Sequence, residues 1–317
     1  MRLSHTQTIV LANQKGGCGK TTTAVNLSAG LALEGYRTCL VDLDGQCNAS
    51  TTFGIDPEEY RRSKKPSVLD AYINKRSAEQ IAVTVTGRFN DLLSILPGHP
   101  ALAALHQQLE AGLRMDALSQ QLSPEEEDDH RRDHRERLVK SLESLHQEFD
   151  CVVLDTPPEL GFLLSTALRA GDWFIIPVFP SEYDLNGLQR LTASAKKIRE
   201  RGNARLRLMS VLVGNYDKST VLDEQIYTRL RQKFGEHLSK VRISRGVKIR
   251  ESTSHHTTIF EHAGTSDHAA QFLEFTREVA ARMEKSLAEV PQPGGRTTSA
   301  PGPDATDELT VGEVSRG

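Results

Sequence analysis

Lys15-Gly-Gly-Cys-Gly-Lys20-Thr21-Thr22 is the stretch of this 317-residue chain that decides its fold. A short β-branched, apolar run precedes it at Thr8–Ala12, and apolar residues at helical spacing follow it from Thr21 to Leu33. This pattern predicts a strand, a glycine loop and a helix. Main-chain N–H groups of such a loop converge on phosphate oxygens, and the amino end of the helix favours the same negative charge. The stretch therefore predicts a phosphate-binding loop.

The residue types within the loop suit a nucleoside triphosphate bound with magnesium. Glycines let the main chain approach the phosphates, Lys20 reaches the β- and γ-phosphates, and the Thr21 hydroxyl ligates Mg²⁺. We therefore predict ATP and Mg²⁺ as the cofactors. The predicted nucleotide contacts of the loop are Lys15, Gly16, Gly17, Cys18, Gly19, Lys20, Thr21 and Thr22.

Short apolar runs alternate with helical patterns along the rest of the chain. Strands are predicted at Arg37–Leu43, Leu92–Leu96, Cys151–Asp155, Trp173–Val178, Leu206–Val213 and Val241–Ser244, and helices at Ser141–Glu148, Gly187–Arg201, Leu222–Phe234 and Ala269–Ser286. Such alternation predicts an α/β fold with a mostly parallel sheet and helices on both faces.

The composition allows one sizeable domain, because 38% of the residues are hydrophobic. We predict that residues 1–289 form this domain, with a charged insertion at about residues 120–138. Ser123–Arg137 is almost wholly charged and cannot supply a core face, so we interpret it as a solvated segment rather than a specific binding element. Residues 290–317 are rich in Pro, Gly, Ser and Thr, which predicts a disordered polar tail.

Cysteine spacing and the apolar runs bear on the compartment. The four cysteines show no CxxC pair, and the first residues lack a charged leader followed by an apolar core. No apolar run approaches the roughly 20 residues that cross a bilayer. We therefore expect a cytoplasmic protein without a membrane anchor. The formal charge of -3 neither requires nor excludes a nucleic-acid partner.

A second acidic motif lies at the end of the strand predicted at Cys151–Asp155, where Thr-Pro-Pro158 follows. An apolar strand that ends in a carboxylate is the Walker B arrangement. Its acid reaches Mg²⁺, typically through water, because magnesium keeps part of its hydration shell. We predict Asp155, together with Thr21, as the metal-binding residues.

The additional lysine at position 15 resembles that of the ParA/MinD family of deviant Walker A ATPases, whose KGGxGKT loop carries a second lysine. The resemblance implies that Lys15 crosses a sandwich dimer and touches the partner's phosphates. Val41–Ser50 is similar to the family's DxDPQGN segment, with Gly45 in place of the usual Pro and Cys47 in place of the usual Gly.

The resemblance also implies roles for the two aspartates of this segment. Asp44 would orient the attacking water, and Asp42 would lie nearer the phosphates and the metal. Phosphoryl transfer needs mainly positioning and charge neutralisation, so one carboxylate beside the γ-phosphate is sufficient. The predicted catalytic residues are Lys15, Lys20 and Asp44.

Later segments match the family more loosely, over roughly residues 7 to 285. Pro177–Leu188 resembles the stretch that follows the next strand in ParA proteins, and Val213–Asp217 falls where the family places its adenine-facing loop. Asn215 is therefore a candidate adenine contact, although the family's polar residue often stands one position earlier, at Gly214.

Val241–Arg250 resembles the family's basic IPRxVxxxEAP segment. Cations recur there every two or three residues, and phosphate contacts from Arg and Lys give sequence-independent affinity. An ordinary solvated basic face is the alternative interpretation. The predicted DNA contacts are Arg242, Arg245, Lys248 and Arg250.

The resemblance implies a ParA-like partition or positioning ATPase, associated with the nucleoid. ATP would form a sandwich dimer that binds DNA non-specifically, and a ParB-like partner would stimulate hydrolysis. A MinD-like membrane-positioning ATPase is one alternative, but the polar tail lacks the basic amphipathic helix that membrane binding needs. A small-molecule P-loop ligase or synthase is another, and such enzymes usually lack the lysine found at position 15.

Overall fold

The computed structural model describes residues 3–73, 76–105, 107, 108, 111, 115, 136–159, 161–180 and 185–289. In this part of the chain eight strands form a sheet of order β3-β4-β2-β5-β1-β6-β7-β8. All neighbouring strands are parallel except β3 and β4. The strands are β1 (Gln7–Leu11), β2 (Thr38–Asp42), β3 (Val83–Thr84), β4 (Leu93–Leu96), β5 (Cys151–Asp155), β6 (Trp173–Val178), β7 (Arg207–Tyr216) and β8 (Leu238–Ser244).

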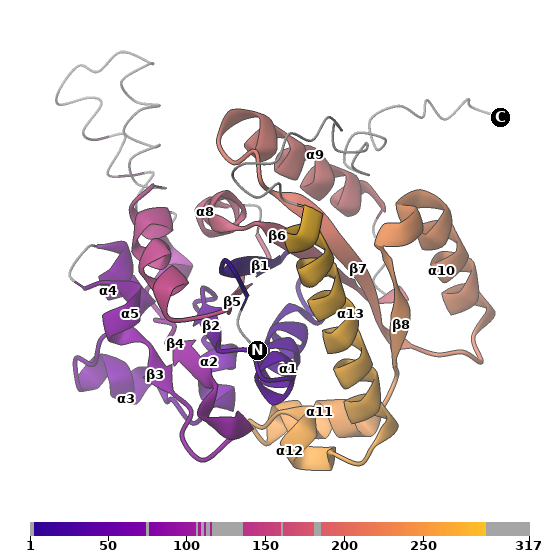
Figure 1. Cartoon of the computed structure of the whole chain (residues 1–317), viewed down its shortest axis with the longest axis horizontal. Coiled ribbons are helices and arrows are strands. Elements are labelled where there is room, and N and C mark those ends of the chain that lie inside the picture. Colours follow the sequence, from indigo (N-terminus) through magenta and orange to yellow (C-terminus); the bar gives the residue numbers. More distant parts are fainter. Residues whose placement is uncertain are drawn as a thin grey trace.

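Helices cover both faces of this sheet (Figure 1). They are α1 (Lys20–Leu33), α2 (Asn48–Thr52), α3 (Pro57–Arg62), α4 (Val68–Tyr72), α5 (Ala78–Ile81), α8 (Phe162–Ala170), α9 (Leu185–Arg201), α10 (Val221–Phe234), α11 (Val247–Ser254), α12 (Ile259–Ala263) and α13 (Asp267–Glu289). Short 3₁₀ turns lie at Phe89–Asp91, Ser144–Gln147 and Gly235–His237. The predicted α/β fold with a mostly parallel sheet is confirmed.

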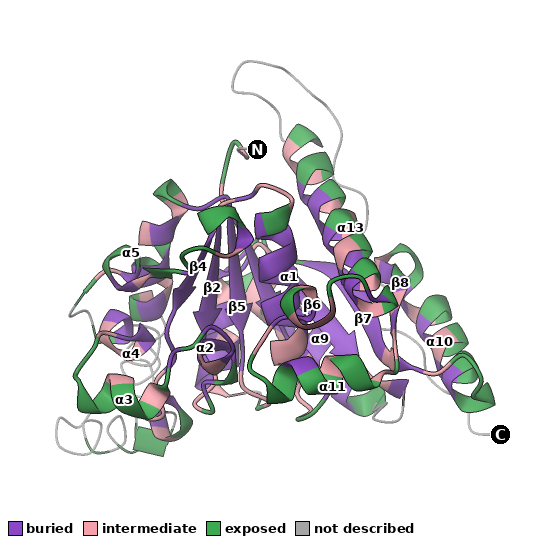
Figure 2. Cartoon of the chain, turned by 90° about the horizontal axis from the view of Figure 1, so that it is seen from below, coloured by how far each residue is buried: buried purple, intermediate pink, exposed green. Residues whose placement is uncertain are grey.

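Strand residues alternate between two hydrophobic cores, as the period of two demands. Ile9 and Leu11 of β1 face the core that α1, α2, α12 and α13 close. Val10 and Ala12 face the opposite core, which α4, α5, α8, α9 and α10 close. Figure 2 shows the strands buried between helices whose outer sides are exposed.

The long helix α13 holds α1 against the sheet (Figure 1). The two helices approach so closely that a Cβ atom at Gly30 of α1 would lie 2.3 Å from the Thr276 hydroxyl oxygen of α13. Glycine permits this approach because it has no side chain. The packing fixes α1, and therefore the loop at its amino end.

The element boundaries agree closely with the sequence. Cys151–Asp155 and Trp173–Val178 are strands with the predicted bounds, whereas the two-residue strand β3 was not predicted. The helix predicted at Ser141–Glu148 is wrong in its second half, because the chain tightens into a 3₁₀ turn from Ser144. The charged insertion, up to residue 135, and the tail 290–317 lie outside the described residues. Within the described residues, no helix combines the length and apolar character that a membrane crossing requires.

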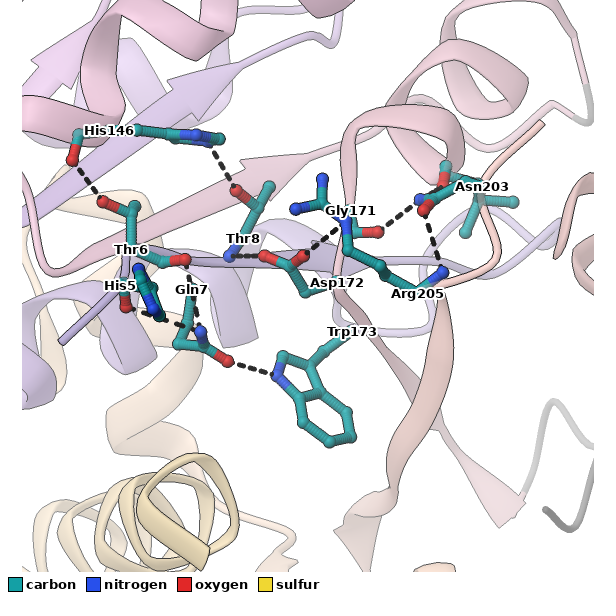
Figure 3. A network of polar contacts seen from close by, with 11 residues as sticks. His5, Thr6, Gln7, Thr8, His146, Gly171, Asp172, Trp173, Asn203 and Arg205 are labelled. Carbon is teal, nitrogen blue, oxygen red and sulfur yellow. Dashed lines mark hydrogen bonds and ion pairs between the residues drawn. The ribbon is translucent and has the colours of Figure 1, made fainter. Parts of the chain in front are cut away.

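The amino ends of the central strands are joined by side-chain hydrogen bonds (Figure 3). The main-chain N–H of Thr8 donates to the Asp172 carboxylate at 2.9 Å, and the Thr8 hydroxyl lies 3.4 Å from His146 Nε2. The Trp173 indole N–H donates to Gln7 Oε1 at 2.8 Å. These bonds connect β1 to the segment before β5 and to the start of β6. They therefore fix the amino ends of the central strands, on the side of the sheet opposite the glycine loop.

Candidate active site

The glycine loop between β1 and α1 has the conformation that anion binding needs. Gly17 has φ 74° and Gly19 has φ 89°, a left-handed region that costs glycine little. Gly19 is the N-cap of α1 and provides no side-chain cap, and Gly16 and Gly17 are exposed. The amino end of α1 therefore presents main-chain donors and a partial positive charge to a ligand.

Lys20 lies inside the loop rather than in solvent. Only 6% of its surface is exposed, and its ammonium donates to the Lys15 carbonyl oxygen at 3.0 Å. The Cys18 thiol lies 3.2 Å from the same oxygen, and burial raises the pKa of this thiol. The loop thus holds the ammonium beside the helix terminus, and the thiol packs against the loop as a protonated group.

Two buried carboxylates end adjacent strands beside the loop. Asp42 of β2 and Asp155 of β5 are register partners, and both are fully buried. Neither oxygen of Asp155 makes a hydrogen bond at normal geometry. Burial and the Asp42 charge raise the pKa of Asp155 well above its ordinary value, while the nearby Thr21 hydroxyl and Lys20 ammonium favour its charged form. A buried carboxylate without partners is costly, so a divalent cation held by Asp155 and Thr21 fits this site.

Asp42 differs from Asp155 because its own loop satisfies it. Its Oδ2 accepts from the main chain and hydroxyl of Ser50, at 2.8 and 2.6 Å, and its Oδ1 accepts from the Asp44 N–H at 3.2 Å. Burial raises the pKa of Asp42 to about 6, although the Ser50 hydrogen bonds oppose the rise. These contacts make Asp42 an anchor for the turn that carries Asp44.

The two departures of this turn from the family pattern have different consequences. A Cβ atom at Gly45 would lie 2.5 Å from the main-chain nitrogen of Ala103, so this position has no room for a side chain. Cys47 adopts φ 54° as the N-cap of α2, a left-handed conformation that glycine adopts without strain. The usual glycine at position 47 suits this geometry better than cysteine does.

A groove of about 350 Å³ runs from the loop along the first turns of α1. Asp44 lies in it, half-buried, and its Oδ1 accepts from the Gln46 N–H at 2.9 Å. The groove brings together predicted and unpredicted residues. It is lined by Gly16, Gly17, Gly19, Lys20, Thr21 and Thr22 of the loop, by Asp44, Asn48 and Thr52, and by Thr253, His256 and Thr257.

A second cavity, of about 470 Å³, opens on the other side of Gly19 and Thr22. Its walls are mainly apolar, with Phe179, Leu212 and Phe272 among them, which suits a planar base. Asn215 lies in this cavity with φ 49°, and Gly214 lies beside it. The structure therefore brings the predicted adenine contact to the cavity adjoining the phosphate loop.

The four predicted DNA contacts differ in their surroundings. Arg242 lies over the rings of Tyr216 and Tyr227, at 4.8 and 4.6 Å from their centroids, and pairs with Glu224 at 3.7 Å, so other groups of the chain engage its charge at a partly exposed position. Arg250 lines the apolar cavity. Arg250 is nevertheless exposed, as are Arg245 just after β8 and Lys248 at the start of α11.

Sequence reasoning missed the contribution of the residues that follow α11. His256 has φ 53°, its N–H donates to Thr253 O at 3.2 Å, and the Thr257 N–H donates to Ser252 O at 2.9 Å. These bonds form a Schellman motif, in which glycine usually takes the left-handed position. Because histidine stands there, the usual glycine signal for a helix end is missing from the sequence.

Phe179 was also missed as a site residue, although it follows directly after the carboxyl end of β6. Its ring would lie 2.9 Å from a Cβ atom at Gly19 and 2.8 Å from one at Gly214. The general rule that ligands bind beyond the carboxyl ends of parallel strands would have found it.

Comparison with known proteins shows which family has this arrangement of loop, strands and acidic residues. Residues 6–208 match the family described as an AAA domain. The chromosome-partitioning ATPase Soj of Thermus thermophilus is 35% identical over 279 residues, which cover 88% of this chain and 97% of that protein. The sporulation initiation inhibitor protein Soj of Bacillus subtilis is 32% identical, with 86% of this chain and 98% of that protein covered.

Among solved structures, cobyrinic acid a,c-diamide synthase of Mycobacterium smegmatis, solved with ADP and magnesium, superposes with a TM-score of 0.69. The match covers 89% of this chain and 96% of that chain at 22% identity, so the likeness is one of fold. Loop, sheet order and paired aspartates define a P-loop nucleoside triphosphatase. Within that class, the chain belongs to the ParA/MinD-type family of P-loop ATPases.

Proposed function

We propose that this protein is a ParA-like ATPase that positions or segregates a DNA-linked or other cargo. ATP joins two copies in a sandwich dimer, the dimer binds DNA non-specifically on the nucleoid, and a ParB-like partner stimulates hydrolysis to release it. The name of the Thermus thermophilus relative, chromosome-partitioning ATPase Soj, supports partition as the process.

The position of α11 is the observation that carries this proposal. Thr253 of this helix lines both the phosphate groove and the apolar cavity. At the other end of the helix, Lys248 is exposed beside Arg245. One short helix therefore connects the nucleotide site with the exposed cations, so nucleotide occupancy and DNA contact have a direct physical connection.

The chemistry follows from the groove. Lys20 and the amino end of α1 bind the phosphates, and Thr21 and Asp155 hold Mg²⁺, which when bound neutralises charge on the β- and γ-phosphates. Asp44 faces the same groove and orients the attacking water. Asp42 keeps the Asp44 turn in place through Ser50.

Replacing Asp44 by Ala tests the hydrolytic role. ATP binding should persist while hydrolysis stops, because only water positioning is lost. Gel filtration with ATP should then show a trapped dimer. A variant that remains monomeric and hydrolyses ATP at the wild-type rate would reject this role for Asp44.

Replacing Lys15 by Gln distinguishes the dimer from the ligase alternative. Nucleotide should still bind through Lys20, but ATP-dependent dimerisation should weaken, because a cation that faces the partner's phosphates is gone. If this variant dimerises like the wild type, Lys15 does not act across an interface. A small-molecule ligase or synthase would then become the better interpretation.

DNA binding is tested by the salt dependence of retention on random-sequence DNA. Log affinity should fall linearly with log salt, by about 0.9 per contacted phosphate, and binding should require ATP. Replacing Arg245 and Lys248 by Glu should abolish retention. The matched control replaces the exposed residues Arg201 and Arg207 by Glu. It changes the net charge by the same amount, but at the amino ends of the strands.

Three outcomes of this experiment are informative. Loss of retention only in the Arg245/Lys248 variant supports the DNA face. Equal loss in the control variant would mean that net charge alone controls retention. ATP-dependent sedimentation with anionic liposomes, without DNA retention, would favour the MinD-like alternative.

A further inference from the structure

A cavity of about 350 Å³ lies beside the glycine loop and is separate from the phosphate groove. Gln14, Lys15 and Cys18 of the loop line it on one side, and Gly187 and Arg190 of α9 line it on the other. Lys20 and Thr21 line the groove but not this cavity. The phosphates of the chain's own nucleotide, held by Lys20 and Thr21, therefore do not occupy it.

The polar groups around this cavity are mainly hydrogen-bond donors. Arg190 Nε donates to Gln14 Oε1 at 3.3 Å, which leaves the Gln14 amide nitrogen as a donor. This nitrogen is buried and has no hydrogen-bond partner. Asn13 adds no acceptor, because its side-chain oxygen accepts from the Lys15 N–H at 3.1 Å and its amide donates to Pro177 O at 2.7 Å.

The Arg190 guanidinium, the Gln14 amide and the cationic residue Lys15 line one cavity, and this combination favours an oxyanion. A guanidinium has five donors and no acceptor, and its planar fork matches phosphate oxygens. An unpaired buried amide donor is costly until an acceptor reaches it. The chemistry of the cavity therefore suits a phosphate oxygen better than a neutral ligand.

We propose that Arg190 and Gln14 receive, together with Lys15, a phosphate oxygen of the nucleotide held by a second copy of this chain. The inference rests on the ATP-dependent dimer of the proposed function and adds two residues to it. Arg190 is then a phosphate-binding residue supplied across the interface. Its bond to Gln14 also fixes the loop position directly before Lys15.

The test measures ATP-dependent dimerisation by sedimentation velocity, with Asp44→Ala as the parent so that ATP persists. Adding Arg190→Ala should weaken dimerisation at least about tenfold, because a charge-assisted hydrogen bond to phosphate is lost in each copy. Arg190→Lys should restore part of the loss, since it keeps the charge without the fork. Monomer affinity for ADP and thermal stability should stay at the parent values.

Arg201→Ala is the matched control, because it removes an exposed arginine from the same helix. Dimerisation of the Arg190→Ala variant at the parent level overturns the inference and leaves the proposed function standing. A parent that stays monomeric with ATP overturns the proposed function and the inference with it. A lower ADP affinity in the Arg190 variants would place Arg190 at the chain's own nucleotide, which also overturns the inference.

A second arm distinguishes the source of the phosphate. Inorganic phosphate is added to the nucleotide-free wild type and to Arg190→Ala, and thermal unfolding is followed. Equal curves for the two proteins support a site that forms only in the dimer. Stabilisation by phosphate that depends on Arg190 would identify a site for a free anion and overturn the assignment to a partner's nucleotide.

Discussion

Buried polar groups are satisfied differently at the two ends of the central strands. The amino edge is the side of the sheet where the parallel strands begin, and the carboxyl edge is the side where they finish. At the amino edge, Asp150 is paired: its carboxylate accepts from Arg37 Nε at 3.2 Å, from Arg37 Nη2 at 2.9 Å and from the Arg37 N–H at 2.9 Å. At the carboxyl edge, Asp155 is equally buried, but neither of its carboxylate oxygens makes a hydrogen bond of normal geometry, although Thr21 and Lys20 lie near. The same residue type is satisfied at one end of strand β5 and unsatisfied at the other.

Residues whose polar groups are satisfied within the chain stabilise the fold, whereas residues whose polar groups are left unsatisfied are suited to bind a ligand. The amino edge closes its network with groups of the chain itself. The Asn203 amide donates to Gly171 O at 2.6 Å (Figure 3) and to Leu168 O at 3.1 Å. The carboxyl edge leaves the oxygens of Asp155 without a hydrogen bond, and Cys47 after β2 and Asn215 near the end of β7 adopt left-handed conformations. Such strain and unpaired charge lower stability and are typical of functional sites.

Lys20→Ala should have the largest effect, and only at the carboxyl edge. Removing the ammonium that faces the β- and γ-phosphates should weaken ATP binding about 100-fold or more, as measured by calorimetric titration. Lys240→Ala, which removes an exposed lysine of β8, is the control and should bind ATP normally. Unchanged ATP affinity in Lys20→Ala would reject the phosphate-loop assignment.

Asp150→Ala should affect only the amino edge. It leaves the Arg37 guanidinium without its buried partner, so the free energy of unfolding should fall by about 2–3 kcal/mol. ATP affinity per folded molecule should not change. Urea unfolding and calorimetry measure the two effects, and a loss of ATP affinity without a loss of stability would contradict the division between the edges.

The sequence predicted most of the fold because the deciding signals are local. Alternating strand and helix patterns predicted the strands from β1 to β8 except β3, whose two residues Val83 and Thr84 are too few to carry a pattern. The 3₁₀ turn at Ser144–Gln147 was missed for a different reason: its residues also suit the α-helix that was predicted there.

The fold places Asp155 beside the glycine loop, as the contiguous motifs that carry the two had indicated, and their roles in binding nucleotide and metal stay predictions. Contacts that the tertiary fold makes between distant residues were not predictable. Arg190 reaches Gln14 across 176 positions of sequence, and nothing near either residue indicates this contact. The segment containing Arg242 looked uniformly basic, yet Tyr227 on α10 engages that arginine.

Asp155→Asn should have the opposite sign to Asp150→Ala. Neutralising a buried carboxylate that lies beside Asp42 removes repulsion in the ligand-free protein, so the free energy of unfolding should rise by about 1–2 kcal/mol. The same variant should lose the extra thermal stabilisation that Mg²⁺ adds to ATP, because ligand-linked stabilisation requires binding to the folded state. Destabilisation of the ligand-free variant would show that Asp155 supports the fold.

The stabilisation that Asp150 gives at the amino edge should decrease as the pH falls. Burial alone would raise the pKa of Asp150, but hydrogen bonds from Arg37 and its positive charge lower that pKa below the ordinary value of 3.8. In the unfolded chain the carboxyl takes up its proton near 3.8, so between the two pKa values the unfolded state binds more protons. The stabilisation by Asp150 is therefore fully present above the unfolded-state pKa and is lost as the pH falls through the folded-state pKa.

Urea unfolding of the wild type and Asp150→Asn should show a difference in the free energy of unfolding of about 2 kcal/mol at neutral pH that shrinks on acidification below pH ~4. A difference that stays constant over this range would mean that the Arg37 pair contributes through packing and not through charge.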